Sequence, residues 1–230
     1  GPYLARHLLA RGYEGHGTSR RPGPDAAANL VRLGIERRVA LHRLDPIDES
    51  RTRAALATIG PDEVYLLAGP SSVARSFAHP DETVGVVVGI VSSLLAAQRH
   101  SGFRLFCASS SECFGSTDAP ADIGTPFRPL SPYGVAKAHA YDKVAQHRAA
   151  QGGYAVSGVL FNHESPLRPE TFVTRKIVRA ATRIAGGSTE KLVLGNLDIE
   201  RDWGWAPEYV EAMHLMVQQD RPDDFVIATG

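Results

Sequence analysis

The stretch Phe103-Arg104-Leu105-Phe106-Cys107-Ala108-Ser109-Ser110-Ser111-Glu112 decides the fold of this chain. Its first six residues are typical of a short buried strand, and the polar residues after them mark the end of that strand. Helical patterns lie on both sides, over residues 83–99 before it and from Ser131-Pro132 to about Gln151 after it. This order of helix, strand and helix is typical of parallel sheets with crossover connections.

The same alternation runs along the whole chain. The expected strands are residues 13–19, 38–44, 63–68, 103–108, 154–161, 191–194 and 225–228. The expected helices are residues 3–11, 26–33, 48–59, 83–99, 131–151, 172–185 and 207–219. Because parallel strands are joined by right-handed crossovers, this pattern predicts an α/β fold with a doubly wound, Rossmann-like parallel sheet. We expect residues 1–161 to form a dinucleotide-binding domain. Residues 162–230 then end the sheet and supply part of a smaller substrate-binding lobe.

Composition excludes several classes of protein. Of the 230 residues 43% are hydrophobic and 22% are charged, which is typical of globular domains and not of disordered or fibrous chains. The 25 basic and 25 acidic residues balance, which argues against a nucleic-acid or polybasic membrane binder. The most apolar run, residues 83–97, is shorter than the ~20 residues of a spanning helix. Cys107 and Cys113 have no partners at metal-ligand spacing, so we expect no metal site and a cytoplasmic protein.

A group of polar residues suggests catalysis. Tyr133 and Lys137 stand four residues apart on a predicted helix, so they share one helical face. A nearby cation favours the phenolate, and we therefore expect Lys137 to lower the pKa of Tyr133 and make it a base. Ser110 and Glu112 follow a strand, and reactive groups gather at the carboxyl ends of strands in such sheets. The alternative is that the serines only form a turn or cap.

Seven segments of the chain resemble the GDP-mannose 4,6-dehydratase family. This family is a branch of the extended short-chain dehydrogenase/reductase superfamily, which uses a catalytic triad of Ser or Thr, Tyr and Lys. The resemblance lies in residues 109–112, 131–137, 160–166, 172–177, 194–198, 201–204 and 224–230.

The resemblance implies an activity and a role for each catalytic candidate. The family oxidises C4 of GDP-mannose with bound NADP, eliminates water across C5 and C6, and returns the hydride to C6, on the route to GDP-fucose. Tyr133 would take the proton of the C4 hydroxyl, and Lys137 would hold the phenolate and the nicotinamide ribose. Ser110 would hydrogen-bond the C4 oxygen. Glu112 would remove the C5 proton, and the dehydration needs this carboxylate whereas simple hydride transfer does not.

The cofactor and substrate candidates follow from the same comparison. Arg20 and Arg21 stand after the strand at residues 13–19, where NAD-preferring folds carry an acid, so they favour NADP. The resemblance places further residues against NADP: Asp45, Leu67, Ala68, Ser71, Tyr133, Lys137, His163 and Arg168. It assigns Asn162, Lys176 and Arg201 to the nucleotide sugar. The basic excess over residues 168–183 suits a diphosphate.

The ends of the chain depart from the family pattern. The family's Gly-rich turn would lie before Gly1, so we expect the first, central strand of the sheet to be missing, and more of the substrate lobe to follow Gly230. We therefore expect little or no turnover by these 230 residues, and a homo-oligomer when the protein is full length. Two other functions stay open: another nucleotide-sugar epimerase or 4-reductase of the superfamily, and a non-catalytic NADP-binding protein.

Overall fold

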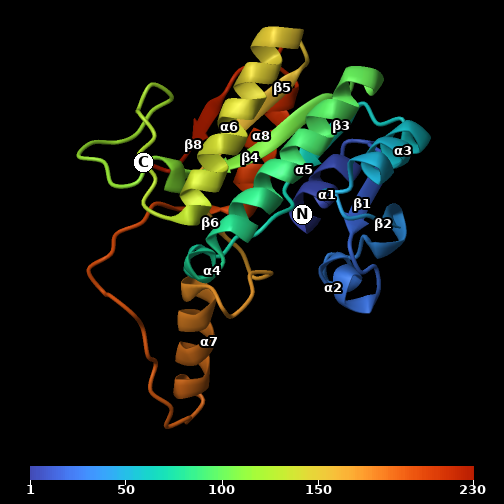
Figure 1. Ribbon diagram of the computed structural model, residues 1–230. Helices are drawn as coiled ribbons and strands as arrows, with labels where there is room; N and C mark the ends of the chain where they lie inside the picture. The colour runs from blue at the N-terminus through green and yellow to red at the C-terminus, as the bar shows by residue number, and fades with distance from the viewer.

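The computed structural model describes residues 1–230, and its central layer is a parallel sheet in two parts (Figure 1). The strands are β1 (Gly15–Ser19), β2 (Val39–Arg43), β3 (Glu63–Leu66), β4 (Arg104–Ser110), β5 (Ala155–Leu160) and β8 (Phe225–Ile227). One part pairs β1 with β2, and the other has the order β3-β4-β5-β8, with all pairs parallel. No pairing joins β1 to β3, so the sheet is interrupted between these two strands.

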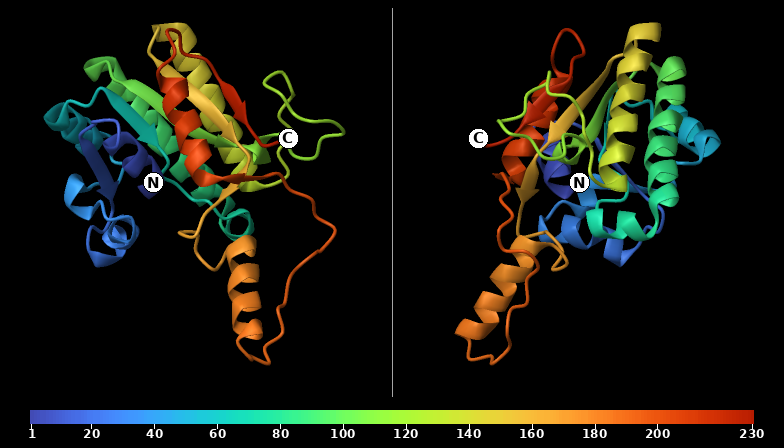
Figure 2. Two further views of the ribbon diagram at one scale, coloured as in Figure 1. Left: turned by 180° about the vertical axis from the view of Figure 1, so that it is seen from behind. Right: turned by 60° about the vertical axis from the view of Figure 1, so that its left-hand side comes forward.

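Helices cover both faces of the sheet, which confirms the doubly wound α/β prediction. They are α1 (Pro2–Leu9), α2 (Pro24–Arg32), α3 (Glu49–Ile59), α4 (Val73–Ala78), α5 (Pro80–Ser101), α6 (Pro132–Gln151), α7 (Val173–Ala185) and α8 (Ala206–Val217). The helices α5 and α6 lie side by side on one face, and α1 packs with α8 on the other (Figures 1 and 2).

The strand β4 is buried on both of its faces. Leu105 and Cys107 pack into the cluster formed with α5 and α6, whereas Phe106 packs against α1 and α8. Each of these three side chains is at most 5% exposed. A central strand of this kind has no solvent-facing side, which is why its sequence is a continuous apolar run and not an alternating one.

The helix α5 is long and apolar enough to span a membrane by length and composition alone. The core helix of a globular domain passes the same test, and α5 matches that description. Its side chains Val87, Ile90, Val91 and Leu94 are buried against the sheet and α6. The packing therefore agrees with the sequence-based prediction of a buried core helix.

Three features differ from the sequence-based prediction. Residues 191–194 do not form the expected strand, because they lie in an exposed stretch with no strand alongside to pair with. A small parallel pair, β6 (Asn162–Glu164) and β7 (Trp203–Trp205), was not expected, since three-residue strands carry no clear periodic pattern. The short helix α4 was also not expected.

The segment after β5 leaves the sheet and then returns to it. The helix α7 projects from the body and has one buried residue, Ala180 (Figure 2). The helix α8 and the strand β8 pack with residues of the first part of the chain. The domain boundary at 161/162 stays a prediction.

Candidate active site

The catalytic candidates come together where β4 ends and α6 begins. Ser110 is the last residue of β4, and the 3₁₀ turn η2 (Ser111–Cys113) carries Glu112 directly after it. The helix α6 begins at Pro132, so Tyr133 lies in its first turn and Lys137 lies one turn later. The fold thus gathers an alcohol, a carboxylate, a phenol and an ammonium at one edge of the sheet.

Tyr133 is the centre of this group and is 9% exposed. Burial raises the pKa of its phenol to about 12, whereas the neighbouring Ser110 side chain lowers it. The carboxylate of Glu112 raises the pKa, and the positive charge of Arg168 lowers it. Three of the predicted site residues therefore act directly on one phenol.

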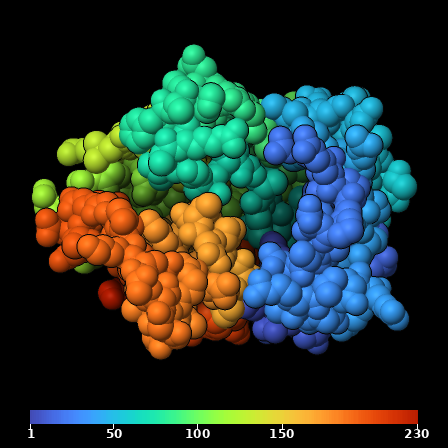
Figure 3. Space-filling view, turned by 90° about the horizontal axis from the view of Figure 1, so that it is seen from below, coloured from blue at the N-terminus to red at the C-terminus, as the bar shows by residue number.

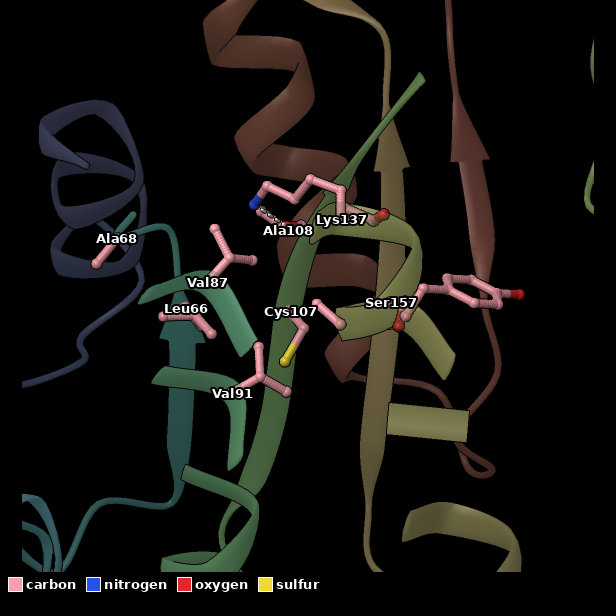
Figure 4. Close-up of a pocket in the computed structure, with 11 residues that line it drawn as sticks. Leu66, Ala68, Val87, Val91, Cys107, Ala108, Lys137 and Ser157 are labelled. Atoms are coloured by element: carbon pink, nitrogen blue, oxygen red, sulfur yellow. Dashed lines mark hydrogen bonds between the residues drawn. The ribbon is translucent and has the colours of Figure 1, made fainter. Parts of the chain in front are cut away.

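Lys137 is held by the backbone of β4. Its Nζ donates a 2.8 Å hydrogen bond to the backbone oxygen of Ala108 (Figure 4). The same nitrogen lies 5.8 Å from the centroid of the Tyr133 ring. Burial lowers the pKa of Lys137. The expectation that Lys137 brings the pKa of Tyr133 below its ordinary value is wrong for this structure. Burial of the phenol outweighs the nearby charge, and the ammonium hydrogen-bonds to the strand.

A small cavity lies beside Lys137. Its volume is about 10 Å³, which is room for about one water molecule, and it is lined mainly by apolar side chains of β3, β4 and α5 (Figure 4). Ala68 and Cys107 are among the residues that line it. The cavity is too small for a nucleotide, but its apolar walls explain why the ammonium of Lys137 is strongly desolvated.

The start of α6 is fixed by a local cap and a close backbone contact. The Oγ of Ser131 accepts a 3.0 Å hydrogen bond from the backbone N–H of Gly134. Pro132 occupies the first helical position, where it removes no helical hydrogen bond. Gly134 rests on the backbone of Glu112, and the Oγ of Ser76 contacts the backbone of Tyr133. The Ser-Pro helix start was predicted from sequence, but the roles of Gly134 and Ser76 were missed because no local pattern signals either contact.

The strand ends around the sheet interruption carry the predicted cofactor residues. Arg20 and Arg21 follow β1, are exposed, and make no ion pair within the protein. Asp45 follows β2, and its carboxylate accepts a hydrogen bond from the backbone of Ile47. Seen from this edge, the first fifty residues, the segment after β3 and the segment after β5 surround a hollow (Figure 3). Two unpaired guanidinium groups at such an edge are a donor set that fits a phosphate-bearing cofactor.

The segment after β3 adds three further candidates. Leu67 packs into the core cluster formed by α1 and α8, so its side chain faces away from the α5 side. Ala68 lines the small cavity beside Lys137. Ser71 is exposed. Of the three, only Ala68 is shown next to a catalytic candidate.

His163 is held in one orientation. Its ring stacks on Tyr209 of α8 with centroids 4.6 Å apart and an interplanar angle of 22°. Its Nδ1 lies 3.0 Å from the backbone oxygen of Phe161, which can only accept, so Nδ1 carries the proton. Burial lowers the pKa of His163, which favours the neutral ring. His163 therefore presents Nε2 as a hydrogen-bond acceptor.

Arg168 is also anchored before any ligand binds. Its Nε lies 3.2 Å from the carboxylate of Glu164, and its guanidinium carbon lies 3.6 Å from the centroid of the Phe172 ring. The charge of Arg168 reaches the phenol of Tyr133 and lowers its pKa. This predicted cofactor residue is thus part of the electrostatic surroundings of the catalytic cluster.

The three predicted substrate residues are more dispersed. Asn162 lies in β6 and is half-buried. The Nζ of Lys176 bonds to the backbone oxygen of Val193, and Arg201 donates a 2.7 Å hydrogen bond to the backbone oxygen of Glu200. Lys176 and Arg201 are exposed, and their partners lie in the segment between α7 and β7. The structure does not bring these two cations to the catalytic cluster, so their assignment stays a prediction. No group of three or more His, Cys, Asp or Glu side chains is arranged to hold a metal ion.

Comparisons with known proteins agree on one family. The family model described as GDP-mannose 4,6 dehydratase matches residues 1–230. GDP-mannose 4,6 dehydratase 1 of Arabidopsis thaliana is 46% identical over all of this chain and 67% of its own length. The GDP-mannose 4,6-dehydratase of Vibrio cholerae is 45% identical over all of this chain and 64% of its own length. The chain therefore spans about two thirds of the length of these relatives.

The solved structures support the fold. The dTDP-glucose 4,6-dehydratase DesIV of Streptomyces venezuelae, with NAD and TYD bound, superposes with a TM-score of 0.84 at 22% identity. The match covers 99% of this chain and 71% of that protein. At this level of identity the likeness shows a shared fold.

Proposed function

Because the chain belongs to the GDP-mannose 4,6-dehydratase family, we propose that its catalytic cluster converts GDP-mannose to GDP-4-keto-6-deoxymannose with NADP as the bound cofactor. The observation that carries the proposal is that Ser110 ends β4, Glu112 follows it in η2, and the backbone of Glu112 packs against Gly134, the residue after Tyr133. The reaction must remove a proton from the C4 hydroxyl and another from C5. A phenol and a carboxylate at one site are the two bases that this requires.

Tyr133 takes the proton of the C4 hydroxyl, and Ser110 hydrogen-bonds the same oxygen. When bound, NADP would accept the hydride of C4 and return it to C6, and C5 would take up a proton in that last step. A phenol with a pKa of about 12 becomes a base near neutrality only when positive charge or hydrogen-bond donors stabilise the phenolate. Ser110 and Arg168 already lower the pKa, and Lys137 lies close enough to the ring to add its charge.

Glu112 performs the elimination. The temporary C4 ketone acidifies the C5 proton, which Glu112 removes. The electron pair left at C5 forms the double bond to C6 as the C6 hydroxyl leaves, and the proton carried by Glu112 turns that hydroxyl into water. One carboxylate therefore serves first as general base and then as general acid. A 4-epimerase or a 4-reductase has no step that needs it.

NADP is preferred to NAD because of the residues at the end of β1. Arg20 and Arg21 stand where an acidic residue would accept the ribose hydroxyls of NAD, and their guanidinium groups suit a 2′-phosphate. The remaining contacts are assigned to Asp45, Leu67, Ala68, Ser71, His163 and Arg168. The sugar nucleotide is assigned to Asn162, Lys176 and Arg201. The protein is proposed to work in the cytoplasm, as a homo-oligomer when full length, on the route to GDP-fucose.

Isotope transfer tests the reaction directly. The protein is mixed in stoichiometric amounts with NADP and GDP-mannose deuterated at C4, so that a single turnover can be detected. The proposed route yields a 4-keto-6-deoxy sugar that carries the deuterium at C6. Glu112→Gln should keep NADP binding and block loss of water, whereas Tyr133→Phe should block oxidation at C4. A product inverted at C4 would identify an epimerase. Unchanged substrate with bound NADP would identify a binding protein.

A further inference from the structure

The backbone N–H groups in the first turn of α6 have a complete set of partners. Pro132 has no N–H. Gly134 donates to the Oγ of Ser131 at 3.0 Å, and Val135 donates to the backbone oxygen of Ser131 at 2.9 Å. The N–H of Tyr133 donates to the Oγ of Ser76 at 3.2 Å. Tyr133 is therefore the one residue of this turn whose N–H is bound by a different element of the fold.

The hydroxyl of Ser76 is oriented for this contact. Ser76 is 1% exposed, and its Oγ donates a 2.6 Å hydrogen bond to the backbone oxygen of Val73. A hydroxyl has one proton, so with that proton committed to Val73 its lone pairs are left to accept from Tyr133. The helix α4 is itself capped at its start, because the Oγ of Ser72 accepts from the N–H of Arg75. Ser76 is thus a fixed acceptor.

The helix α4 directly follows residues 67–71, which we assign to the cofactor. Ser76 therefore connects that segment to the backbone of the catalytic phenol. We propose that Ser76 is a positioning residue: it fixes the position of the Tyr133 phenol relative to residues 67–71, the segment assigned to the cofactor. This inference rests on the proposed function for its catalytic meaning. The hydrogen bond itself is testable without any turnover.

A matched pair of substitutions separates the hydroxyl from simple packing. Threonine and valine have nearly the same shape, but only threonine can accept the hydrogen bond. Ser76→Thr and Ser76→Val are therefore compared in the full chain by amide hydrogen exchange. Ser93→Ala is the control, because Ser93 is also buried, at 2% exposure, and its hydroxyl has no hydrogen-bond partner.

The expected result is local. In Ser76→Val the amide of Tyr133 should exchange at least about fivefold faster than in the parent protein. This factor corresponds to the net stabilisation by one hydrogen bond. The amide of Gly134 stays protected because Ser131 still caps it, and Ser76→Thr and Ser93→Ala leave Tyr133 protected. Equal exchange at Tyr133 in the Thr and Val proteins would overturn the proposal. If Ser76→Val does not fold, Ser76→Ala takes its place against Ser76→Thr.

Turnover then tests the positioning role. Displacement of the phenol should lower kcat about tenfold in Ser76→Val and not in Ser76→Thr, with KM for GDP-mannose and NADP affinity unchanged. A change in KM alone would contradict positioning of the phenol. If none of the proteins, including the parent, forms product even in single-turnover reactions with stoichiometric protein, the proposed function fails for these 230 residues, and the exchange data still decide whether Ser76 holds Tyr133.

Discussion

The backbone oxygen of Glu112 lies 2.5 Å from the point where a β-carbon on residue 134 would stand, so the two can be neighbours only because residue 134 is glycine. Gly134 follows Tyr133 in the first turn of α6. The turn η2 can therefore rest against the helix that carries the phenol. This contact sets the separation between the two proposed bases, Glu112 and Tyr133.

Gly134→Ala should damage both stability and catalysis. The new methyl group would meet the Glu112 backbone and also Pro129, whose Cβ would lie 3.0 Å away. Overpacking of this kind costs about 1–3 kcal/mol in the free energy of unfolding. Movement of Glu112 away from Tyr133 should lower the single-turnover rate by about 100-fold. Chemical denaturation and a single-turnover assay measure the two effects.

Gly85→Ala is the matched control for this substitution. Gly85 lies on the exposed side of α5, and nothing stands within 4 Å of its missing β-carbon. Alanine there should stabilise the protein by about 0.5–1 kcal/mol, because it removes the entropy cost of a helical glycine. If both alanine variants behave alike, the Glu112 contact does not constrain the site.

Titration of Tyr133 provides a second test. Burial raises the pKa of Tyr133 to about 12, so without cofactor the phenol should stay protonated above pH 10. The folded pKa lies above the unfolded one of ~10, so this group stabilises the fold fully below pH ~10, and the contribution is lost as pH rises toward 12. NMR of tyrosine labelled at Cζ follows the titration.

Ser110→Ala should raise that pKa further, because the Ser110 side chain lowers it more than the charge of Arg168 does. Ser111→Ala serves as the control, since Ser111 lies next to Ser110 in the chain but outside the groups that shift the phenol. Ionisation of Tyr133 below pH 10 in the cofactor-free protein would show that the phenol is not desolvated as the structure indicates.

Local signals explain which parts of this fold can be predicted from sequence. The start of α6 depends on Ser131-Pro132, a cap and a first-turn proline that act within four residues. The buried strands could be predicted because a strand that helices cover on both faces consists of a continuous run of apolar residues. Residues 191–194 have the same apolar character, but no neighbouring strand is present for them to pair with. Their hydrophobicity therefore predicted a strand, but it does not show whether a second strand is available to pair with them.

The parts of the site that sequence could not predict depend on distant residues. Ser76 and Tyr133 are 57 positions apart, and no spacing rule relates them. The pKa of Tyr133 was expected to fall because Lys137 is four residues away, but burial by the whole surrounding fold dominates it. A sequence shows which charges are near along the chain, whereas desolvation depends on everything that packs around the group.

The ion pair of Arg148 and Asp224 predicts a large effect on stability. Arg148 donates two hydrogen bonds to the carboxylate, at 2.9 and 2.6 Å, and the backbone N–H of Ser157 donates a third at 2.8 Å. The Asp224 side chain is 5% exposed. Asp224→Ala leaves Arg148 without its partner and should cost about 3–5 kcal/mol in the free energy of unfolding, measured with urea.

Glu170→Ala is the control for Asp224→Ala, because it removes one partner of an ion pair that is exposed to solvent. Glu170 pairs with Arg179 at 2.8 Å, but both side chains are about half exposed. Solvent screens such a pair, so its loss should cost less than about 1 kcal/mol. Equal losses in the two variants would mean that burial does not strengthen the Arg148 pair.

A chain of hydrogen bonds between α1, β3 and α8 should make stability depend on pH. Tyr13 donates to Glu63 at 3.0 Å, so its oxygen accepts from Nε2 of His214, also at 3.0 Å. The Nδ1 of His214 is then the acceptor for Nε2 of His7, 3.4 Å away. This order of donors requires that His214 carry no proton on Nδ1.

Acid should weaken the contacts of His7 at one end of this chain, because a proton on its Nδ1 prevents that nitrogen from accepting the 3.2 Å hydrogen bond of Arg11. Burial lowers the pKa of His7, and the charge of Arg11 lowers it further, while Glu211 raises it. Since the folded pKa lies below the unfolded one of ~6.5, the stabilisation is complete above pH ~6.5 and is lost as pH falls below it. The free energy of unfolding should therefore drop between pH 7.5 and 5.5. The drop should be smaller in His7→Leu, which removes the titrating ring, than in His100→Leu, which removes an exposed ring at the end of α5. If both variants keep the full pH dependence, these hydrogen bonds do not control the acid response.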